Sequence, residues 1–597
     1  MPCAPCAAPA EIDALFEEAV AELTALLETC KAAVQTEPEL QFCLSLLCRL
    51  VLSAVIDADR QDTAEFMNNT TFAKPPENRK PLWAALLANV EAHLATKGGQ
   101  RPIDAVRAEI SQQCGAFSAK GSGIYRLSVP TGSGKTLSAL RFALQTAGQY
   151  NKTRLVLATP LLSILDQNAK AIKKAVQRDE VILEHHSNLI QIFNEKDELD
   201  ANELLTETWQ SSIIITTTFQ LLHTLFRAET TCIRRFGALA GSVIVLDEVQ
   251  TLPRHMITQF NLALNFLAYV CGATVVLCSA TQPSFETAVH PLRFESPRDI
   301  VPPSPGLFAA FRRTRLVDCT KEKPGGYTYE ELAELALNAL PKARSVLLIC
   351  NTKNQAARLF ALLQHTDAAV FHLSTSMCMA HRQDTLQSIT DALKQTGTQV
   401  ICVATQLVEA GVDFSFGCVV RVLAGLDNLI QAAGRCNRHG EYGFLCPVYV
   451  VNLKGEDLNR LPEILQAQSA ARALLEAFRQ NPARFGGELD SQEAIAFYYH
   501  NLFQNMHEQE QDYPVSKNYP NSKKPSAVKE NFTLFSLLSN NSSFRAKKNT
   551  SPLTNIGQAF LSAGQAFFVF GYTGCNVRVR YGEGTARIDE LGCNVSL

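Results

Sequence analysis

The alternation of apolar and polar positions divides the chain into a helical beginning and two series of short apolar runs. Residues 11–30 place Ile, Leu, Phe and Val at helical spacing between glutamates, and residues 41–66 continue that pattern. This spacing predicts amphipathic helices. From about residue 121 the pattern changes to short runs rich in Val, Ile and Leu, each followed by a helical segment. Such a succession is typical of a parallel sheet with helices on both faces.

Two series of these runs follow one another, so the sequence predicts an α/β architecture that is built twice. The first series is IYRLSV, TRLVLAT, SIIITTT, SVIVLDE and ATVVLCSA, and the second is SVLLICNT, AAVFHLS, TQVICVAT, CVVRVLAG and CPVYVVNL. Between them lies VPPSPG, residues 301–306, whose three prolines predict a linker. After about residue 455 the pattern weakens to helical pieces.

Length and composition place the chain among folded, soluble multidomain proteins. The 597 residues suggest about three to five domains, and 46% hydrophobic with 19% charged residues excludes a disordered polymer or a fibre. Lysine plus arginine total 55 against 58 acidic residues, a net charge of -3. Because this balance gives no overall attraction to phosphate polymers, any nucleic-acid contact must come from local patches.

Cysteine usage and apolar run length predict a cytoplasmic protein with no membrane partner. The 18 cysteines are scattered from Cys3 to Cys593, which suits a reducing compartment, and the CAPC pair at the N-terminus lacks two further zinc ligands. The most apolar stretch, residues 42–56, is broken by Arg49 and is shorter than the ~20 residues of a membrane span.

A basic segment near the C-terminus has two interpretations. Residues 517–548 carry seven basic residues and one acidic residue among many Asn, Ser and Pro. This composition favours a loop over a surface for a polyanion, and both remain open.

The strongest chemical signal is SVPTGSGKT, residues 128–136, which lies between a predicted strand and a predicted helix. Glycines at 132 and 134 allow backbone N–H groups to surround phosphate oxygens at a helix N-terminus. Lys135 would neutralise the β and γ phosphates, and Thr136 would offer its hydroxyl to magnesium. The strict pattern wants a glycine where this chain has Val129. The residues assigned to the nucleotide are Pro130, Thr131, Gly132, Ser133, Gly134, Lys135 and Thr136.

A second signal is VIVLDEVQ, in which a strand ends in two carboxylates. Ligands of open α/β sheets bind at the carboxyl ends of strands. Asp247 can therefore hold magnesium, and Glu248 can orient or deprotonate an attacking water. Alone, such a pair is more often a solvated strand end. With the phosphate loop upstream, it predicts nucleotide hydrolysis with magnesium, which a kinase or a switch GTPase could also perform. Ser279 and Thr281 at another strand end suit a link from the nucleotide site to another part of the protein.

The second series ends in QAAGRCNR, which places Gln431, Arg435 and Arg438 within eight residues. If this segment is helical, spacings of four and three put the three side chains on one face. Two arginines aimed across a cleft are what phosphoryl transfer requires, and a solvated helix edge is the alternative.

In this order the motifs resemble those of superfamily 2 helicases: PTGSGKT, TPLLSILDQN, TTTFQ, LDEVQ, SATQP, NTKNQA, ATQLVEAGVDF and QAAGRCNR. LDEVQTLP, FHLSTSMCMAHR and LDNLIQAAGRCNRHGE are similar to the type I CRISPR-associated helicase-nuclease, which Cascade recruits. The resemblance implies two RecA-like domains that move single-stranded DNA, with 3'-to-5' polarity, as ATP closes and reopens their cleft. It also implies Cascade with its CRISPR RNA as partner.

The same resemblance assigns strand contacts and a nucleotide sensor. Asp413 would sense the nucleotide through the ribose or an arginine and couple it to DNA through the 405–406 pair. Hydroxyls and amides can bind phosphate without positive charge. The residues implied to contact DNA are Thr159, Ser163, Gln167, Asn168, Thr217, Thr218, Gln220, Thr405 and Gln406.

The family joins this motor to an N-terminal HD nuclease, and here the sequence departs from it. LVLSAVIDADRQDTAEF resembles only the closing segment of that nuclease, with Asp57 or Asp59 in the place of its last metal ligand. No histidine precedes His93, and one or two carboxylates cannot assemble a two-metal site. We therefore expect no nuclease activity from this chain unaided; a separate nuclease chain, a degenerate gene and a truncated product all remain open.

The sequence thus predicts four regions and one leading function. The regions are a helical HD remnant with linker (1–100), RecA-like domain 1 (101–300), RecA-like domain 2 (301–455), and a linker with a partial accessory domain (456–597). The leading function is an ATP-dependent DNA translocase or helicase of CRISPR interference. The alternatives are a catalytically silent Cascade- or DNA-binding remnant and a general repair or RNA helicase.

Overall fold

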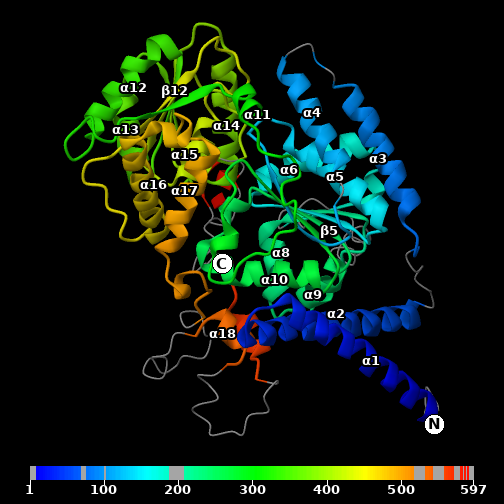
Figure 1. The fold of residues 1–597 in the computed structure, drawn as a ribbon. Helices are drawn as coiled ribbons and strands as arrows, with labels where there is room; N and C mark the ends of the chain where they lie inside the picture. The colour runs from blue at the N-terminus through cyan, green and yellow to red at the C-terminus, as the bar shows by residue number, and fades with distance from the viewer. Residues whose placement is uncertain are drawn as a thin grey trace.

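The protein consists of two lobes, each built on a parallel sheet, with a pair of N-terminal helices across the end of one lobe (Figure 1). A computed structural model describes residues 9–68, 76–97, 99, 102–117, 119–186, 208–409, 411–515, 532–541, 557–569, 579–582, 584–586 and 588–589. The CAPC pair and most of the basic segment 517–548 lie outside the described residues, as does most of the chain beyond residue 569.

The first lobe contains a six-stranded parallel sheet in the order β1-β6-β5-β2-β4-β3. The central strands are rich in Val, Ile and Leu and are buried along their length, because helices cover both faces. Its strands are β1 (Gly123–Ser128), β2 (Leu155–Thr159), β3 (Ile182–His185), β4 (Ile213–Thr217), β5 (Val243–Asp247) and β6 (Thr274–Ser279). Its helices are α3 (Lys80–Ala95), α4 (Pro102–Ala116), α5 (Lys135–Tyr150), α6 (Leu162–Val176), α8 (Thr218–Phe226), α9 (Thr230–Phe236) and α10 (Ile257–Tyr269).

The second lobe repeats this plan with the order β7-β12-β11-β8-β10-β9, again all parallel. Its strands are β7 (Thr314–Asp318), β8 (Ser345–Ile349), β9 (Ala369–Leu373), β10 (Val400–Ala404), β11 (Cys418–Val422) and β12 (Cys446–Val451). Its helices are α12 (Tyr329–Ala343), α13 (Lys353–Leu363), α14 (Met379–Lys394) and α15 (Leu426–Ala433). The predicted fold class, two tandem RecA-like sheets with helices before them, is confirmed.

Each sheet holds one strand that the apolar runs do not reveal. β3 and β7 are edge strands of their sheets, and their sequences, ILEH and TRLVD, are short and mixed in polarity. An edge strand with one side toward solvent needs no continuous apolar run. The two series of five predicted strands therefore each become six.

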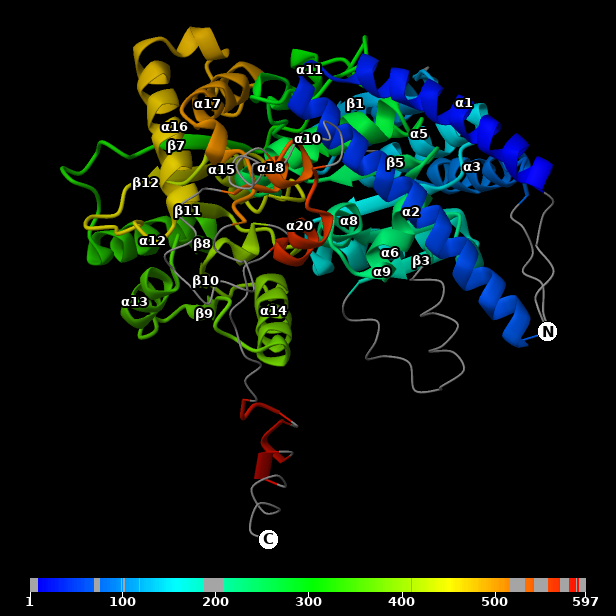
Figure 2. The same cartoon turned by 90° about the horizontal axis from the view of Figure 1, so that it is seen from below.

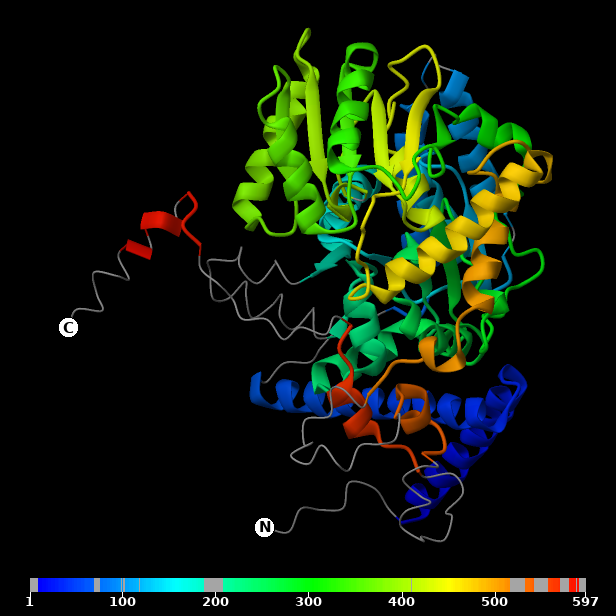
Figure 3. The same cartoon turned by 90° about the vertical axis from the view of Figure 1, so that its left-hand side faces the viewer.

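The two N-terminal helices, α1 (Pro9–Ala33) and α2 (Glu37–Asn68), lie at the end of the molecule opposite the second sheet (Figure 3). Both helices pack against α10, and α2 also packs against α9. Arg49 of α2 donates to the backbone carbonyls of Thr224 and Arg227 at 2.7–3.1 Å. By length and composition the stretch Glu37–Met67 could cross a membrane, but 44% of its most apolar window is buried against this lobe, so it is weak evidence for a span.

A C-terminal pair of helices, α16 (Pro462–Gln480) and α17 (Gln492–Gln504), packs together beside the second lobe (Figure 2). The Tyr498 hydroxyl donates to Asp427 of the second lobe at 2.9 Å, and Tyr499 donates to the Thr281 carbonyl of the first lobe at 3.4 Å. The pair therefore contacts both lobes. The remaining helices are α11 (Pro305–Ala310), in the predicted linker, and α18 (Leu534–Leu538) and α20 (Phe560–Ala566).

Candidate nucleotide site between the lobes

The phosphate loop connects β1 to α5, as the strand and helix around SVPTGSGKT predict. Gly132 and Gly134 adopt φ values of +81° and +82°, which residues with a Cβ rarely adopt. Val129, at the position where the strict pattern has glycine, is fully buried in the core of the first lobe. Val129 therefore serves packing in the core, and the two glycines that shape the phosphate loop are present.

Lys135 lies between the two carboxylates at the end of β5. Its Nζ is 2.8 Å from Asp247 Oδ1 and 2.6 Å from Glu248 Oε1. The three groups meet because β1 and β5 flank β6 in a parallel sheet, so their carboxyl ends share one edge. Glu248 has a φ of +49°, an unfavourable conformation for a side-chain-bearing residue that recurs at functional sites.

Burial and the ion pairs oppose one another in this cluster. Burial lowers the pKa of Lys135, but the Asp247 and Glu248 carboxylates outweigh it, so the net pKa lies above its ordinary value. Burial raises the pKa of Asp247 despite the ammonium beside it. For Glu248 burial also acts upward, but Lys135 and Gln250 outweigh it and lower the pKa. The ammonium of Lys135 thus favours the ionised form of both carboxylates, and its effect exceeds that of burial only at Glu248.

Asn168 belongs to this cluster. The Thr136 hydroxyl donates to Asn168 Oδ1 at 3.1 Å, and Asn168 Nδ2 donates to Asp247 Oδ2 at 3.4 Å. The sequence grouped Asn168 with the strand contacts because it follows Gln167 in one motif. The structure instead places its amide against the nucleotide residues, since α6 packs beside α5 and successive residues of a helix point to different faces.

A short chain of polar contacts connects Glu248 to the end of β6. Gln250 Nε2 donates to Glu248 Oε2 at 2.6 Å, and the Ser279 hydroxyl donates to Gln250 Oε1 at 2.6 Å. Ser279 Oγ also accepts from the Thr281 backbone N–H at 2.9 Å. Gln250 was not singled out from the sequence, although it stands inside the LDEVQ motif that could have indicated it.

The two arginines of the second lobe come from a turn rather than from one helix face. α15 ends at Ala433, and the N–H groups of Arg435 and Cys436 turn back to the carbonyls of Ala432 and Ala433. The expectation that 431, 435 and 438 share a helical face is therefore wrong: Gln431 alone lies on α15. The short 416–436 bridge ends the helix here because it draws the chain toward Phe416.

Arg435 and Arg438 have different surroundings. Arg435 is buried, and its guanidinium donates to the carbonyls of Val408 and Glu409 at 2.9 and 2.7 Å. Arg438 Nε lies 2.6 Å from Asp413 Oδ1, so Asp413, the expected nucleotide sensor, contacts an arginine in this structure. Arg438 is the one of the two whose side chain is partly exposed.

A cavity of about 560 Å³ lies where the lobes face each other. Pro130, Thr131 and Gly132 of the phosphate loop line one side, and Gly434 to Arg438 line the other, with Arg435 behind this surface. Residues from the 303–314 segment, which runs from the predicted linker through α11 to the start of β7, and from the 486–495 segment complete its walls. The second lobe therefore presents Arg438 toward the same space as the glycine loop.

The residues implied to contact DNA follow the carboxyl ends of neighbouring strands. Thr159 ends β2, and Thr217 ends β4, where its hydroxyl accepts from the Gln220 N–H at 3.2 Å and caps α8. Ser163 and Gln167 are exposed on α6, and a Cβ on Gly411 of the second lobe would collide with Ser163 Oγ. Thr218 is half-buried at the start of α8, and Thr405 is buried after β10.

The structure gives the candidate nuclease residues other partners. Asp57 Oδ1 accepts from Arg234 of α9 at 2.7 Å, and Asp57 Oδ2 accepts from Gln61 at 2.8 Å. Asp59 lies one turn from Thr63, whose hydroxyl donates to its backbone carbonyl. Within the described part of the chain, no group of three or more His, Cys, Asp or Glu side chains is arranged to hold a metal ion.

Tandem parallel sheets, a glycine loop, a strand-end Asp-Glu pair and an arginine across the cleft are the arrangement typical of superfamily 2 helicases. Residues 111–288 match the DEAD/DEAH box helicase family, and residues 342–441 match the family described as CRISPR-associated nuclease/helicase Cas3, C-terminal. The chain is therefore Cas3-like, with a DEAD/DEAH box helicase domain.

Curated relatives and solved structures agree with this placement. The CRISPR-associated nuclease/helicase Cas3 of Haloferax volcanii is 24% identical over 54% of this chain and 45% of its own, and a putative Cas3 of Methanocaldococcus jannaschii is 22% identical over 62% and 52%. The chain thus spans about half the length of the curated relatives it matches. Crystal structures of T. fusca Cas3, alone and with AMPPNP, share the fold, with TM-scores of 0.53 and 0.52 at 20% identity, covering 70% and 67% of this chain and 53% and 54% of theirs.

Proposed function

We propose that the chain is an ATP-dependent single-stranded DNA translocase or helicase of CRISPR interference, acting on target DNA held by Cascade. The observation that carries the proposal is the arrangement around the 560 Å³ cavity. Lys135, Asp247 and Glu248 meet at one strand edge beside the glycine loop. Arg438 lines the cavity opposite residues 130–132, and its charge helps to lower the pKa of Glu248. Such a site can bind a triphosphate in one lobe and respond to it in the other.

ATP with magnesium fits the residues present. Ser133 Oγ is buried without a hydrogen-bond partner in the described chain, which suits a loop whose polar groups await phosphate oxygens. Lys135 would exchange its carboxylate contacts for the β and γ phosphates, and Thr136 and Asp247 would hold magnesium. Bound ATP would supply the phosphoanhydride bond whose cleavage drives the cycle. Glu248 would orient the attacking water and accept its proton, and Arg438 would meet the developing charge.

The strand edge opposite the core is the proposed DNA path. Thr159 and Thr217 end β2 and β4, and Thr405 follows β10. These three side chains are buried, so the exposed polar groups at this edge are Ser163 and Gln167 of α6. Hydroxyls, amides and helix N-termini can bind a phosphate backbone without sequence preference. Opening and closing of the cleft would then change the distance between the DNA contacts of the first lobe and those of the second lobe.

We further propose that this chain does not cut DNA by itself. The support is that Asp57 is held by Arg234 and Gln61. A two-metal nuclease needs several imidazole and carboxylate ligands in one place, and the described residues bring no such set together.

The test is ATP turnover by the purified chain with and without single-stranded DNA. We expect DNA to raise turnover in the wild type, and Lys135→Ala to abolish the increase while thermal unfolding shows an intact fold. Stimulated turnover that survives in Lys135→Ala would refute the assigned phosphate loop. If the wild type binds DNA or Cascade but hydrolyses no ATP, the chain is instead a silent binding remnant.

A nuclease assay on the same preparation tests the second part of the proposal. We expect no metal-dependent nicking of single-stranded DNA, with magnesium, manganese or nickel added. Nicking that copurifies with the protein and persists in an Asp57→Ala, Asp59→Ala double variant would show a nuclease centre elsewhere in the chain.

A further inference from the structure

The second lobe contains a buried ion pair that none of the motif assignments uses. Arg421, in the middle of the second sheet on β11, has a fully buried side chain, and its Nε donates to Glu409 Oε1 at 2.8 Å. Glu409 is 3% exposed, and its second oxygen accepts from Asn428 Nδ2 at 2.7 Å. Burial raises the pKa of Glu409 even with Arg421 beside it.

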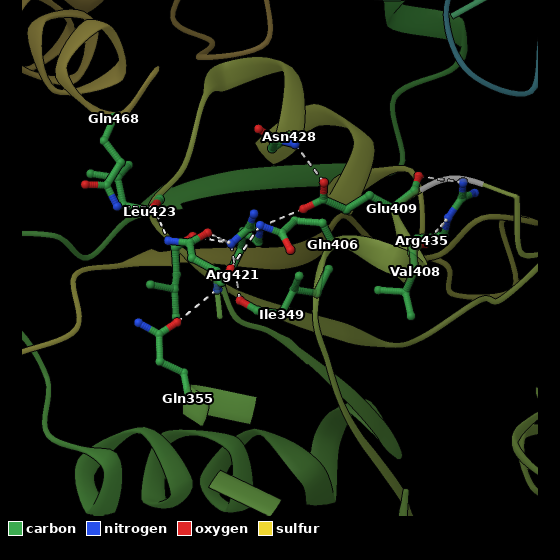
Figure 4. Close-up of polar contacts among 12 residues, drawn as sticks. Ile349, Gln355, Gln406, Val408, Glu409, Arg421, Leu423, Asn428, Arg435 and Gln468 are labelled. Atoms are coloured by element: carbon green, nitrogen blue, oxygen red, sulfur yellow. Dashed lines mark hydrogen bonds and ion pairs between the residues drawn. The ribbon is translucent and has the colours of Figure 1, made fainter. Parts of the chain in front are cut away.

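Glu409 connects this pair to residues 434–438, the turn after α15 that carries Arg435 and Arg438 (the arginine turn). Its backbone carbonyl accepts from Arg435 Nη2 at 2.7 Å, while the neighbouring Val408 carbonyl accepts from Arg435 Nε at 2.9 Å. Figure 4 shows Glu409 between Arg421 on one side and Arg435 on the other. One residue thus holds Arg435 through its backbone and is itself held through its carboxylate.

Arg421 is also connected, through Asn351, to Gln406, which is implied to contact DNA. Its Nη1 donates to Asn351 Oδ1 at 2.7 Å, and the backbone carbonyl of Asn351 accepts from Gln406 Nε2 at 3.2 Å. Asn351 Nδ2 in turn donates to Glu456 Oε1 at 2.9 Å, beside Gln468 of α16. The guanidinium fork therefore joins three segments, the end of β8, the 406–409 turn and, through Glu409, the start of the arginine turn.

Stability alone gives a weak reason for such a pair. Removing two charges from water costs several kcal/mol, and well-packed apolar side chains in the same place are often as stable or more stable. The planar fork of arginine fixes direction as well as charge, because it can hold several acceptors at once. The weak contribution to stability and the fixed direction of its hydrogen bonds both suit an ion pair that holds separate segments at fixed positions relative to one another.

We propose that Glu409 and Arg421 are positioning residues that fix the place of Arg435 and link it, through the buried Asn351, to Gln406, one of the residues implied to contact DNA. The inference rests on the proposed ATP-driven DNA motor. When Arg435 leaves the Val408 and Glu409 carbonyls to approach a nucleotide, the turn that carries Gln406 loses two contacts and can move. In the other direction, DNA that holds Gln406 fixes the turn and with it Arg435, as reciprocal coupling requires.

The experiment compares the ratio of DNA-stimulated to basal ATP turnover in the wild type and in Glu409→Gln. The variant keeps the shape of the side chain and removes its charge, so Arg421 loses its ionic partner. We expect the ratio to fall by about 2- to 30-fold, the range of coupling changes along such networks, while KM for ATP stays within about twofold because the phosphate loop is untouched. A merely structural role would lower basal and stimulated turnover together and leave the ratio unchanged.

Glu39→Gln is the matched control. Glu39 is a buried carboxylate of the first lobe, 6% exposed, paired with His290 at 2.7 Å. The chemical change is the same, but the site lies away from the cavity and the strand-facing residues. We expect Glu39→Gln to lower the thermal unfolding midpoint and to leave the turnover ratio at the wild-type value.

Arg421→Lys is the second variant, and it serves if Glu409→Gln does not fold. Lysine keeps the charge but has no fork, so it cannot hold Glu409 and Asn351 together. We expect a loss of the ratio similar to that of Glu409→Gln, and no further loss in the double variant, because both changes interrupt one link.

Three outcomes overturn the inference. A wild-type ratio in both folded variants would show that the pair does not couple the sites, and an equal loss in Glu39→Gln would show that the effect is general. A wild type that DNA does not stimulate would refute the proposed function and the inference with it. A stimulated wild type with unchanged variants overturns the inference alone.

Discussion

Asn168 and Gln167 are adjacent on α6, yet their surroundings differ, and we predict that they serve different ligands. Asn168 bridges the Thr136 hydroxyl and the Asp247 carboxylate, whereas Gln167 is exposed. Replacing Asn168 by alanine should therefore impair ATP hydrolysis, and replacing Gln167 should impair DNA binding. Variants of these two adjacent residues therefore test the nucleotide site and the DNA contacts separately.

The size of the Asn168→Ala effect follows from the two hydrogen bonds. The bond from Thr136 at 3.1 Å is neutral and contributes about 0.5–1.5 kcal/mol, and the bond to Asp247 is charge-assisted but long at 3.4 Å, so it contributes less than the usual ~1.5–3 kcal/mol. Together they hold Thr136 and Asp247 with about 1–3 kcal/mol. At 1.36 kcal/mol per factor of ten, kcat/KM for ATP should fall by about 5- to 150-fold.

The assay is steady-state ATPase with saturating single-stranded DNA, together with DNA affinity by fluorescence anisotropy without nucleotide. We expect Asn168→Ala to lower kcat/KM and to leave DNA affinity at the wild-type value. Gln167→Ala, the matched control, should weaken DNA binding and leave KM for ATP unchanged. Weakened DNA binding with wild-type hydrolysis in Asn168→Ala would refute the reasoning and return this residue to the strand contacts.

Two further predictions concern the second lobe and acid stability. Arg438→Ala should lower kcat by at least about 100-fold with little change in KM, because the guanidinium meets charge that develops in the transition state; Arg438→Lys should not restore turnover, and near-wild-type kcat in either variant would remove Arg438 from the site. The His185 ring accepts from Trp209 Nε1 at 3.1 Å and lies beside Arg235, and burial lowers its pKa to about 3. Since the unfolded chain binds a proton below its ordinary pKa of 6.5 and the folded chain does not, stability is fully present above pH 6.5 and is lost as pH falls toward 3, by about 2 kcal/mol at pH 5. Chemical unfolding of the wild type and His185→Gln between pH 7.5 and about 5 tests this, and parallel curves would contradict it.

Much of the fold could be predicted from the sequence because parallel strands that are buried on both faces must be continuously apolar. All ten predicted strands form, in two sheets. The edge strands β3 and β7 were not predicted, because polar residues interrupt their apolar character: Glu184, His185, Arg315 and Asp318. Their pairing depends on a neighbouring strand far along the chain, which no local pattern specifies.

Part of the candidate site could likewise be predicted from the sequence, and part depends on tertiary packing. The residue types at SVPTGSGKT and LDEVQ indicated a phosphate loop and its acidic partners, because their chemistry depends on local turns and strand ends. The roles of Gln250 and Asn168 depend on the strand order and on the packing of α6 beside α5. The end of α15 at Ala433 depends on a contact with Phe416.

The sequence by itself determined the two parallel sheets, the position of the phosphate loop and the residue types that face it, since each follows from local periodicity or from a motif on a turn. Only the tertiary structure decided which side chains meet. Arg421 reads as one polar residue in an apolar strand, and its link through Glu409 to Arg435 arises where three separate segments pack together. A charge inside a core is tolerated only with partners in place, and the packing of the whole lobe brings those partners.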